Sequence, residues 1–299
     1  MSDEFIGDLK TGKLRGFLEA VYQDQTLCLE IRDEYVSIYY RGGNLFRIKP
    51  SAAGYSVAFD SNYSEDKKKT IQQIRPGDYQ KWIENIPALK SEMDNWFFRH
   101  PKPEREIQQL IVNENNHGAL ARDTDYFIAD IEYADSENSS RFDMIALKWL
   151  SKGPTRKMRK LTPAFIEVKH GDSALAGSAG IEKHVADISS FLSDTEKKKS
   201  FYKELEIVFE QKLKLELIQG VPNLTEGIEI NTETNPELIF IFANHKPTKS
   251  VLRRELEKVS YMADYAELKA RCDIKIATSS MMGYGLYSEN MWSLEDFIK

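Results

Sequence analysis

Charged residues inside two apolar runs constrain this chain more than any other feature. The first run spans residues 142–150 and carries Asp143, and the second, residues 165–169, places Glu167 and Lys169 between hydrophobic residues. Strand side chains alternate between faces, so Glu167 and Lys169 should point to the same side of a sheet. Ionised groups in strands this apolar cost free energy unless they are paired or bind something charged. The pattern therefore predicts a small polar site on an otherwise apolar sheet.

Length and composition limit the classes of protein to consider. A chain of 299 residues exceeds one typical domain, and its hydrophobic content of 41% is enough for a real core. The net charge of −6 does not indicate a nucleic-acid-binding protein, although binding depends on local patches more than on the total. Cys28 and Cys272 are too few and too far apart for a disulfide framework or a cysteine zinc site.

Two sorting signals are absent from the sequence. Residues 1–20 hold four acids and lack the apolar core of a signal peptide, and no run of about 18 apolar residues could form a transmembrane helix. We therefore expect a cytoplasmic protein that has no membrane partner.

The first hundred residues read as a small β-rich module. β-branched and aromatic residues dominate four short segments between residues 26 and 60, and glycines at positions 42 and 43 suit a hairpin turn. Residues 78–98 have the spacing of a helix with a break or kink at Pro87. Prolines at 101 and 103 follow, so we expect a β-rich N-terminal domain over residues 1–100 and a second domain over 101–299.

The second domain alternates helices and strands. Expected helices cover residues 104–113, 178–192, 201–218 and 249–269, and expected strands cover residues 126–133, 142–150, 165–169, 237–243 and 272–278. Strands in a hairpin-connected meander are followed by strands separated by helices. This order predicts an α/β (α+β) fold, a mixed sheet flanked by helices on both faces.

The pattern Phe142-Asp143, a gap, and then Glu167-Val168-Lys169 resembles the PD-(D/E)XK nuclease superfamily, which includes restriction endonucleases and DNA-repair nucleases. The similarity covers roughly residues 104–245, and Phe142 stands where the family has proline. It implies a restriction-endonuclease-like sheet in which Asp143, Glu167 and the backbone carbonyl of Val168 bind Mg²⁺, with Mn²⁺ as a possible substitute.

The resemblance also implies roles for three further side chains. Lys169 would orient or help to deprotonate the attacking water, and Glu106 would complete the acidic cluster. His184 falls near the position where many members place a glutamine or another polar group. Glu104 or Glu114 could serve instead of Glu106, and His184 could be an ordinary structural histidine.

The residue types fit this chemistry without reference to a family. Magnesium prefers oxygen ligands and retains several waters, so two carboxylates and a carbonyl are a sufficient protein shell. A loop over residues 151–160 holds five cations and no acid, and it could grip a phosphate backbone or be a solvated hairpin tip. Its cations are Lys152, Arg156, Lys157, Arg159 and Lys160.

The sequence thus predicts a metal-dependent nuclease that hydrolyses phosphodiester bonds, with DNA favoured over RNA by the resemblance. Alternation of Glu167 and Lys169 on a solvated strand face remains the competing structural reading. The alternative function is a catalytically silent nucleic-acid-binding subunit, or a protein-interaction subunit of a defence or restriction system. A homodimer or a defence-system partner is compatible with either function.

Overall fold

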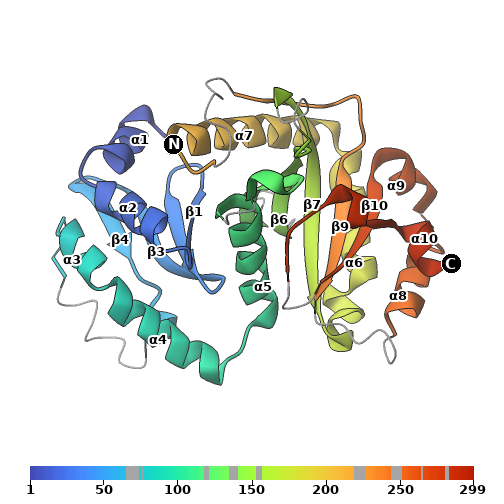
Figure 1. Cartoon of the computed structure of the whole chain (residues 1–299), viewed down its shortest axis with the longest axis horizontal. Coiled ribbons are helices and arrows are strands. Elements are labelled where there is room, and N and C mark those ends of the chain that lie inside the picture. Colours follow the sequence, from blue (N-terminus) through green and yellow to red (C-terminus); the bar gives the residue numbers. More distant parts are fainter. Residues whose placement is uncertain are drawn as a thin grey trace. The chain divides into compact units, whose positions relative to one another are not determined.

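The computed structural model describes residues 1–64, 74–75, 77–117, 121–134, 141–152, 157–218, 227–243, 251–263, 265–279 and 283–299. They form two compact units (Figure 1). The first consists of Met1–Gln109 and Gln211–Leu217, and the second of Leu110–Glu210 and Ile218–Lys299. The predicted division near residue 100 therefore differs from the observed one, which falls within helix α5 (Pro103–Val112). The predicted α/β class, with a β-rich N-terminal part, is confirmed.

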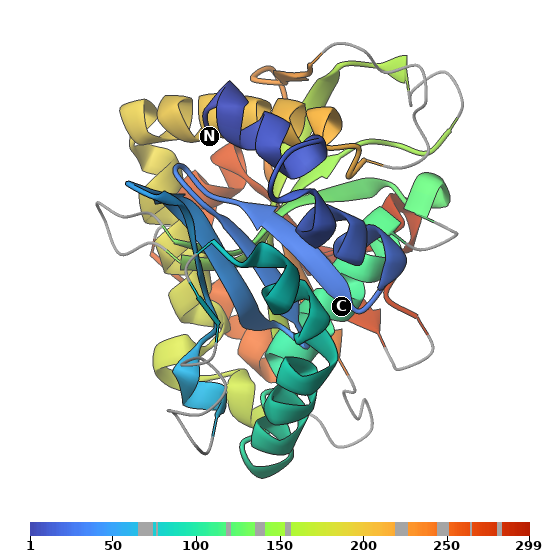
Figure 2. The same cartoon turned by 90° about the vertical axis from the view of Figure 1, so that its left-hand side faces the viewer.

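The first unit contains the predicted antiparallel meander, with strand order β1-β2-β3-β4 (Figure 2). At the turn between β2 and β3, Arg41 and Gly42 have positive φ values of 51° and 70°. Glycine accepts this conformation without a steric penalty, as the hairpin prediction required. The strands are β1 (Leu27–Ile31), β2 (Val36–Tyr40), β3 (Gly43–Ser51) and β4 (Gly54–Ala58).

Helices supply the rest of the first unit's core. The helix expected over residues 78–98 is divided at Asn85, because proline is tolerated in the first turn of a helix but clashes in its interior. Phe46 of the sheet contacts Phe17 and Trp82 edge to face at ring-centroid distances of 5.5 and 5.7 Å. The helices are α1 (Asp3–Lys10), α2 (Arg15–Gln23), α3 (Tyr79–Glu84) and α4 (Ile86–Arg99).

A distant segment of the chain completes this core. Leu215 and Leu217 are buried within it. Lys212 Nζ donates to Glu30 Oε2 at 2.8 Å, and both side chains are almost fully buried. The pair links the segment to β1 through a contact 182 residues apart in sequence.

The second unit is built on a seven-stranded sheet, whose main path runs in the order β11-β10-β9-β7-β6-β5. β5, β6 and β7 are antiparallel neighbours, whereas β7, β9 and β10 are parallel. The strands are β5 (Tyr126–Ala134), β6 (Arg141–Lys148), β7 (Lys160–His170), β8 (Glu229–Ile230), β9 (Glu237–Ala243), β10 (Asp273–Ser279) and β11 (Trp292–Ser293).

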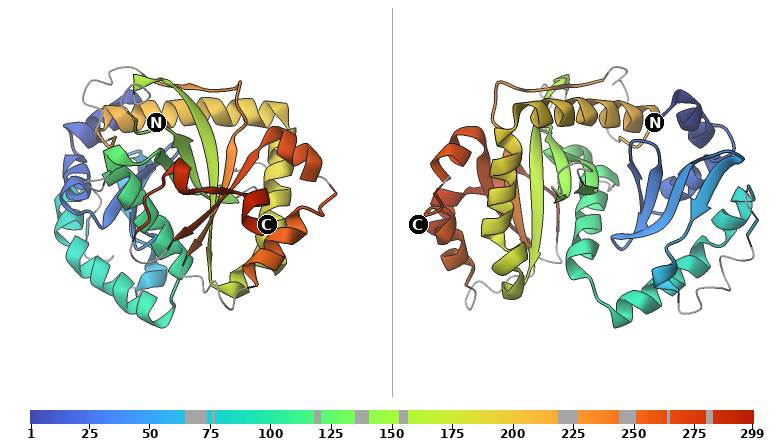
Figure 3. Two further views of the ribbon diagram at one scale, coloured as in Figure 1. Left: turned by 45° about the vertical axis from the view of Figure 1, so that its right-hand side comes forward. Right: turned by 180° about the vertical axis from the view of Figure 1, so that it is seen from behind.

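Elements on both sides of β7 bury its centre. In β7 every residue from 163 to 169 is buried, as expected for a strand covered on both faces. Figures 1 and 3 show α6 along one face of the sheet. The expected helix over 249–269 is not continuous: Ser260 ends its first part, α8. The helices are α6 (Ile181–Ser193), α7 (Thr195–Lys214), α8 (Leu252–Val259), α9 (Tyr265–Arg271) and α10 (Leu294–Ile298).

None of the helices in the described ranges combines the length and apolarity that crossing a bilayer would require.

The buried Glu30–Lys212 pair leads to a stability prediction. Lys212→Met should lower the free energy of unfolding by about 3–5 kcal/mol, because it removes the buried ammonium that is bonded to the Glu30 carboxylate. The double variant Glu30→Leu with Lys212→Met should recover most of this loss, since the two apolar side chains fill the same space. Urea unfolding monitored by circular dichroism measures both. Equal destabilisation in the single and double variants would contradict the interpretation.

Candidate active site

Asp143 and Glu167 meet where the β6–β7 ladder ends. Met144 pairs with Ile166 in the last regular position, and Asp143 lies one residue beyond it. The backbone N–H of Val168 donates to Asp143 Oδ2 at 2.8 Å. The backbone N–H of Asp143 donates to Glu167 Oε1 at 3.4 Å. Each carboxylate thus binds the backbone of the opposite strand, which holds the two acids next to each other.

Lys169 and His184 lie on the far side of the Glu167 carboxylate. Lys169 Nζ is 3.8 Å from Glu167 Oε2 and donates to His184 Nε2 at 2.9 Å. Glu167 is 0% and Lys169 4% exposed, so both charges are withdrawn from water. The predicted alternation on a shared face is therefore observed, and this face is covered rather than solvated.

The hydrogen bond from Lys169 determines the tautomer of His184. An ammonium group has only donors, so Nε2 must be the acceptor and Nδ1 carries the ring proton. Nδ1 lies 3.0 Å from Glu167 Oε2. Among the described residues neither of these two atoms has a hydrogen-bond partner of good alignment, and both are buried. Glu167 Oε2 therefore makes no aligned hydrogen bond to the described residues, although Lys169 Nζ and His184 Nδ1 lie 3.8 and 3.0 Å from it.

Burial and like charge perturb the titration of this cluster. Desolvation raises the pKa of Glu167 to about 7, although the ammonium of Lys169 opposes it. Desolvation and the adjacent Glu167 carboxylate raise the pKa of Asp143 well above its usual range. Burial and the charge of Lys169 lower the pKa of His184. Two carboxylates that resist joint ionisation are the groups that a divalent cation would stabilise as anions.

Aromatic packing fixes the elements that carry these side chains. Phe142, Phe165 and Phe191 form a mutual cluster with ring centroids 5.0–5.7 Å apart. Phe191 follows His184 by seven residues, or two turns of α6, so both lie on the same face of that helix. Packing of Phe191 on the sheet therefore brings His184 to Lys169.

The donors in this cluster fit a hard divalent cation. Asp143 and Glu167 supply carboxylates. In a β-strand the N–H and C=O of one residue face the same neighbour, so the Val168 carbonyl opens toward Asp143 as its N–H does. No cluster of three or more His, Cys, Asp or Glu residues suited to a metal occurs among the described residues. Magnesium is commonly held by one or two carboxylates, with water and substrate oxygens completing its shell, so this donor set suffices.

Glu106 has a different partner from the one its predicted role requires. It belongs to the first unit, where its Oε1 accepts from Arg41 Nη2 at 2.6 Å and from Nε at 3.1 Å. Arg41 also pairs with Asp94 at 2.8 Å. Glu106 is therefore an ion-pair partner of Arg41 within its own unit, and its role at the acidic cluster stays a prediction.

The cations of the predicted basic loop are mostly engaged in exposed contacts. Lys152 pairs with Glu289, and Lys160 Nζ lies 2.7 Å from Glu233 Oε1. Arg159 Nε donates to the carbonyl of Gly227 at 2.9 Å, and Lys157 is exposed. Arg156 lies outside the described residues.

Asp187 is an acid near the site that the sequence analysis did not select. Its charge contributes to the raised pKa of Glu167 and opposes the lowering of the pKa of His184. It follows His184 by three residues on α6, and residues three apart share a helix face. The i, i+3 spacing from His184 was the signal that could have identified it.

The raised pKa of Glu167 predicts how stability depends on pH. The folded chain binds more protons than the unfolded chain between the unfolded pKa of about 4.3 and the folded value of about 7. The free energy of unfolding contributed by Glu167 therefore falls as pH rises through this window, by roughly 3 kcal/mol in total.

Glu167→Gln should remove this slope. The measurement is the difference in unfolding free energy between wild type and variant from pH 4.5 to 7.5 without divalent metal. Glu237→Gln is the matched control, because Glu237 is a buried acid of the same sheet bound to Lys148 and Tyr126. If the unfolding free energies of wild type and Glu167→Gln differ by the same amount at every pH, the pKa of the Glu167 carboxyl is not raised by folding.

The chain was compared with protein-family models, curated proteins and solved structures. It matches no protein-family model, no curated protein and no solved structure. Roles for Asp143, Glu167 and Lys169 therefore rest on their own geometry and charge.

Proposed function

We propose that the protein is a metal-dependent nuclease that hydrolyses phosphodiester bonds, with DNA as the favoured substrate. One observation carries the proposal: two carboxylates and an ammonium meet at the end of the β6–β7 ladder, and one carboxylate oxygen lacks an aligned partner. A cluster of this kind is expensive to bury, and perturbed ionisable groups concentrate at functional sites.

Asp143, Glu167 and the Val168 carbonyl would hold Mg²⁺, or Mn²⁺ in its place. When bound, the ion supplies positive charge for developing phosphate anions and acidifies a water molecule. Its charge would also relieve the repulsion that raises the pKa of Asp143 beside Glu167.

Lys169 would supply a second positive charge at the phosphate. Its Nζ lies beside the Glu167 carboxylate and is oriented by the acceptor Nε2 of His184. An ammonium held in this way can neutralise a nonbridging oxygen and align the attacking water. His184 acts on the reaction through Lys169 and is a positioning residue.

Phosphate binding by the loop after β6 would require its ion pairs to open. The pairs of Lys152 with Glu289 and Lys160 with Glu233 are exposed, and solvent screening leaves exposed pairs little net stability. A polyanion could displace these acids at low cost, and the resulting affinity should fall steeply with salt.

The nuclease proposal predicts a specific pattern of lost activity. Supercoiled plasmid and linear duplex DNA are incubated with protein in Mg²⁺ or Mn²⁺. Asp143→Asn, Glu167→Gln and Lys169→Met should each lower the cleavage rate by about 100-fold or more, because each removes a group needed at the phosphate. Glu237→Gln, the matched buried acid, should retain wild-type cleavage once the folded fraction is equal.

Two outcomes would contradict a nuclease. Binding of DNA without cleavage would favour the silent nucleic-acid-binding subunit, and neither binding nor cleavage would favour the interaction subunit. An equal loss of cleavage in Glu237→Gln would attribute the effect to sheet stability. A matched duplex RNA in the same assay tests the preference for DNA.

Metal binding should also be visible without substrate. At a Mg²⁺ concentration ten times its Kd, wild-type protein should gain about 1.4 kcal/mol of stability, seen as a rise of a few degrees in Tm. Asp143→Asn should abolish most of this gain and Glu237→Gln should keep it. Differential scanning calorimetry makes the comparison, and an identical Mg²⁺ response in all three proteins would place the ion elsewhere.

A further inference from the structure

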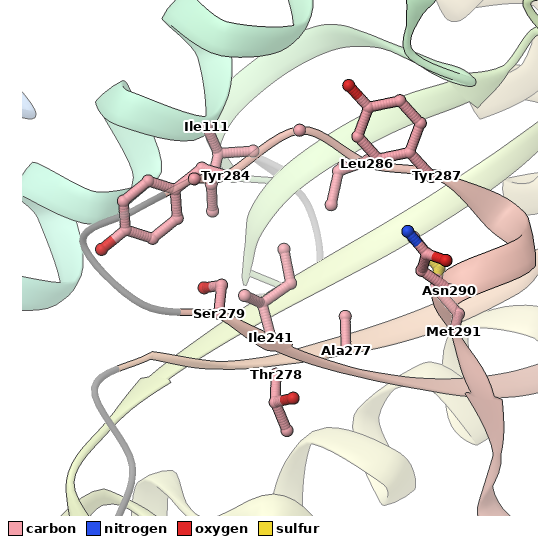
Figure 4. A pocket seen from close by; sticks show the side chains of 12 residues that line it. Ile111, Ile241, Ala277, Thr278, Ser279, Tyr284, Leu286, Tyr287, Asn290 and Met291 are labelled. Carbon is pink, nitrogen blue, oxygen red and sulfur yellow. The ribbon is translucent and has the colours of Figure 1, made fainter.

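A cavity of about 130 Å³ lies on the sheet face opposite Glu167 and Lys169 (Figure 4). In the β7–β9 ladder Phe240 pairs with Glu167, whereas the next residue, Ile241, lines the cavity. Neighbouring residues of a strand point to opposite faces, so the sheet separates the cavity from the acidic cluster. Neither the candidate metal ligands nor Lys169 therefore lines the cavity.

The cavity has a floor of strand residues and a roof of loop residues. Ile241 of β9 with Ala277 and Ser279 of β10 form the floor, near the carboxyl ends of two parallel strands. The roof is the segment 283–287, and Ile111 closes one side. Crevices at the carboxyl ends of parallel strands are frequent ligand sites in open α/β sheets.

Two buried polar residues hold the roof in place. Asn115 Nδ2 donates to the carbonyl of Tyr284 at 3.0 Å, and its Oδ1 accepts from the N–H of Leu286 at 2.9 Å. Asp125 accepts from the N–H and hydroxyl of Ser288 at 2.9 and 3.0 Å. The N–H of Asp125 also donates to the carbonyl of Leu286 at 2.8 Å. The cavity is thus preformed, which reduces the entropy cost of filling it.

The chemistry of the lining defines the ligand class. Among the described lining residues there is no Asp, Glu, Lys, Arg or His, so a charged ligand would be desolvated without a counter-ion. The Ser279 hydroxyl oxygen is buried and has no hydrogen-bond partner among the described residues, and the Asn290 amide lies at one end of the lining. A ligand that satisfies Ser279 must carry a polar edge.

The volume limits the ligand to a single ring. An engineered apolar cavity of about 150 Å³ binds benzene. The present cavity is similar in size but adds a hydroxyl group that benzene cannot satisfy. We propose that it binds an uncharged single-ring heterocycle with hydrogen-bonding edges, the class that includes the free pyrimidine bases. This proposal does not depend on the nuclease activity.

The test uses the full-length protein with uracil, cytosine and thymine as probes. Benzene serves as the apolar comparison and uridine monophosphate as the charged one. Saturation-transfer NMR and isothermal titration should detect binding of at least one base with a Kd on the order of 1 mM or tighter. Benzene and the nucleotide should bind at least tenfold more weakly.

Three variants locate the binding. Ala277→Leu should abolish it by filling the cavity, and Ser279→Ala should weaken it about tenfold through loss of one hydrogen bond. Thr278→Ala is the matched control: Thr278 of β10 also lines the cavity, but its side chain points away from the other lining side chains (Figure 4), so binding should not change. If Ala277→Leu does not fold, the comparison of Ser279→Ala with Thr278→Ala decides.

Several results would overturn the proposal. If none of the bases binds at concentrations up to roughly 10 mM, about tenfold above the expected Kd, the cavity holds only water. Benzene binding as tightly as the bases, with no effect of Ser279→Ala, would mean a purely apolar void. Binding that survives in folded Ala277→Leu would place the ligand elsewhere.

Discussion

Burial of the Glu167 carboxylate in the central strand of the second unit is the constraint on which the site depends. A carboxylate withdrawn from water must be protonated, paired or bound to a cation. Here the ammonium of Lys169 is 3.8 Å away, the backbone N–H of Asp143 is 3.4 Å away, and His184 Nδ1, at 3.0 Å, makes no aligned hydrogen bond to the carboxylate. The raised pKa of Glu167 expresses the same imbalance. The sheet therefore holds an acid whose environment is incomplete without further positive charge.

Two other buried acids show that this chain can compensate a carboxylate fully. Glu30 is bonded to Lys212 at 2.8 Å. Glu237 accepts from Lys148 and from the hydroxyl of Tyr126, both at 2.7 Å. Each of these acids therefore has a short contact to a cation. Glu167 differs from both because a buried oxygen remains without an aligned donor, and this difference favours a binding role over a structural one.

Local periodicity explains what the sequence could predict. Alternation put Glu167 and Lys169 on one face of β7, and the glycines at 42 and 43 marked a hairpin. Strand β9 (Glu237–Ala243) has the predicted bounds because a short apolar run between polar residues leaves little choice. These features depend on neighbours within a few residues, so the sequence alone carries them.

Contacts between distant segments explain what it could not predict. Glu106 was selected as an acid on the helix that precedes the sheet, yet its carboxylate pairs with Arg41, which lies 65 residues earlier in the chain. Residues 211–217 continue an amphipathic helical pattern but join the core of the first unit through Lys212. The sequence around Glu106 does not indicate Arg41 as its partner, and the sequence around Lys212 does not indicate Glu30. The same holds for His184, whose tautomer depends on a lysine from another element.

Register in the parallel part of the sheet relates the acidic cluster to the cavity. Ser279 of β10 pairs with Ala243 of β9, and Ala243 pairs with His170, the residue after Lys169. Both sites thus lie toward the carboxyl edge of the same three strands, where parallel strands end together. Alternation then assigns them to opposite faces, one lined with buried charge and the other neutral. A side chain can be changed on one face while the lining of the other stays intact, so the two sites can be tested separately in one protein.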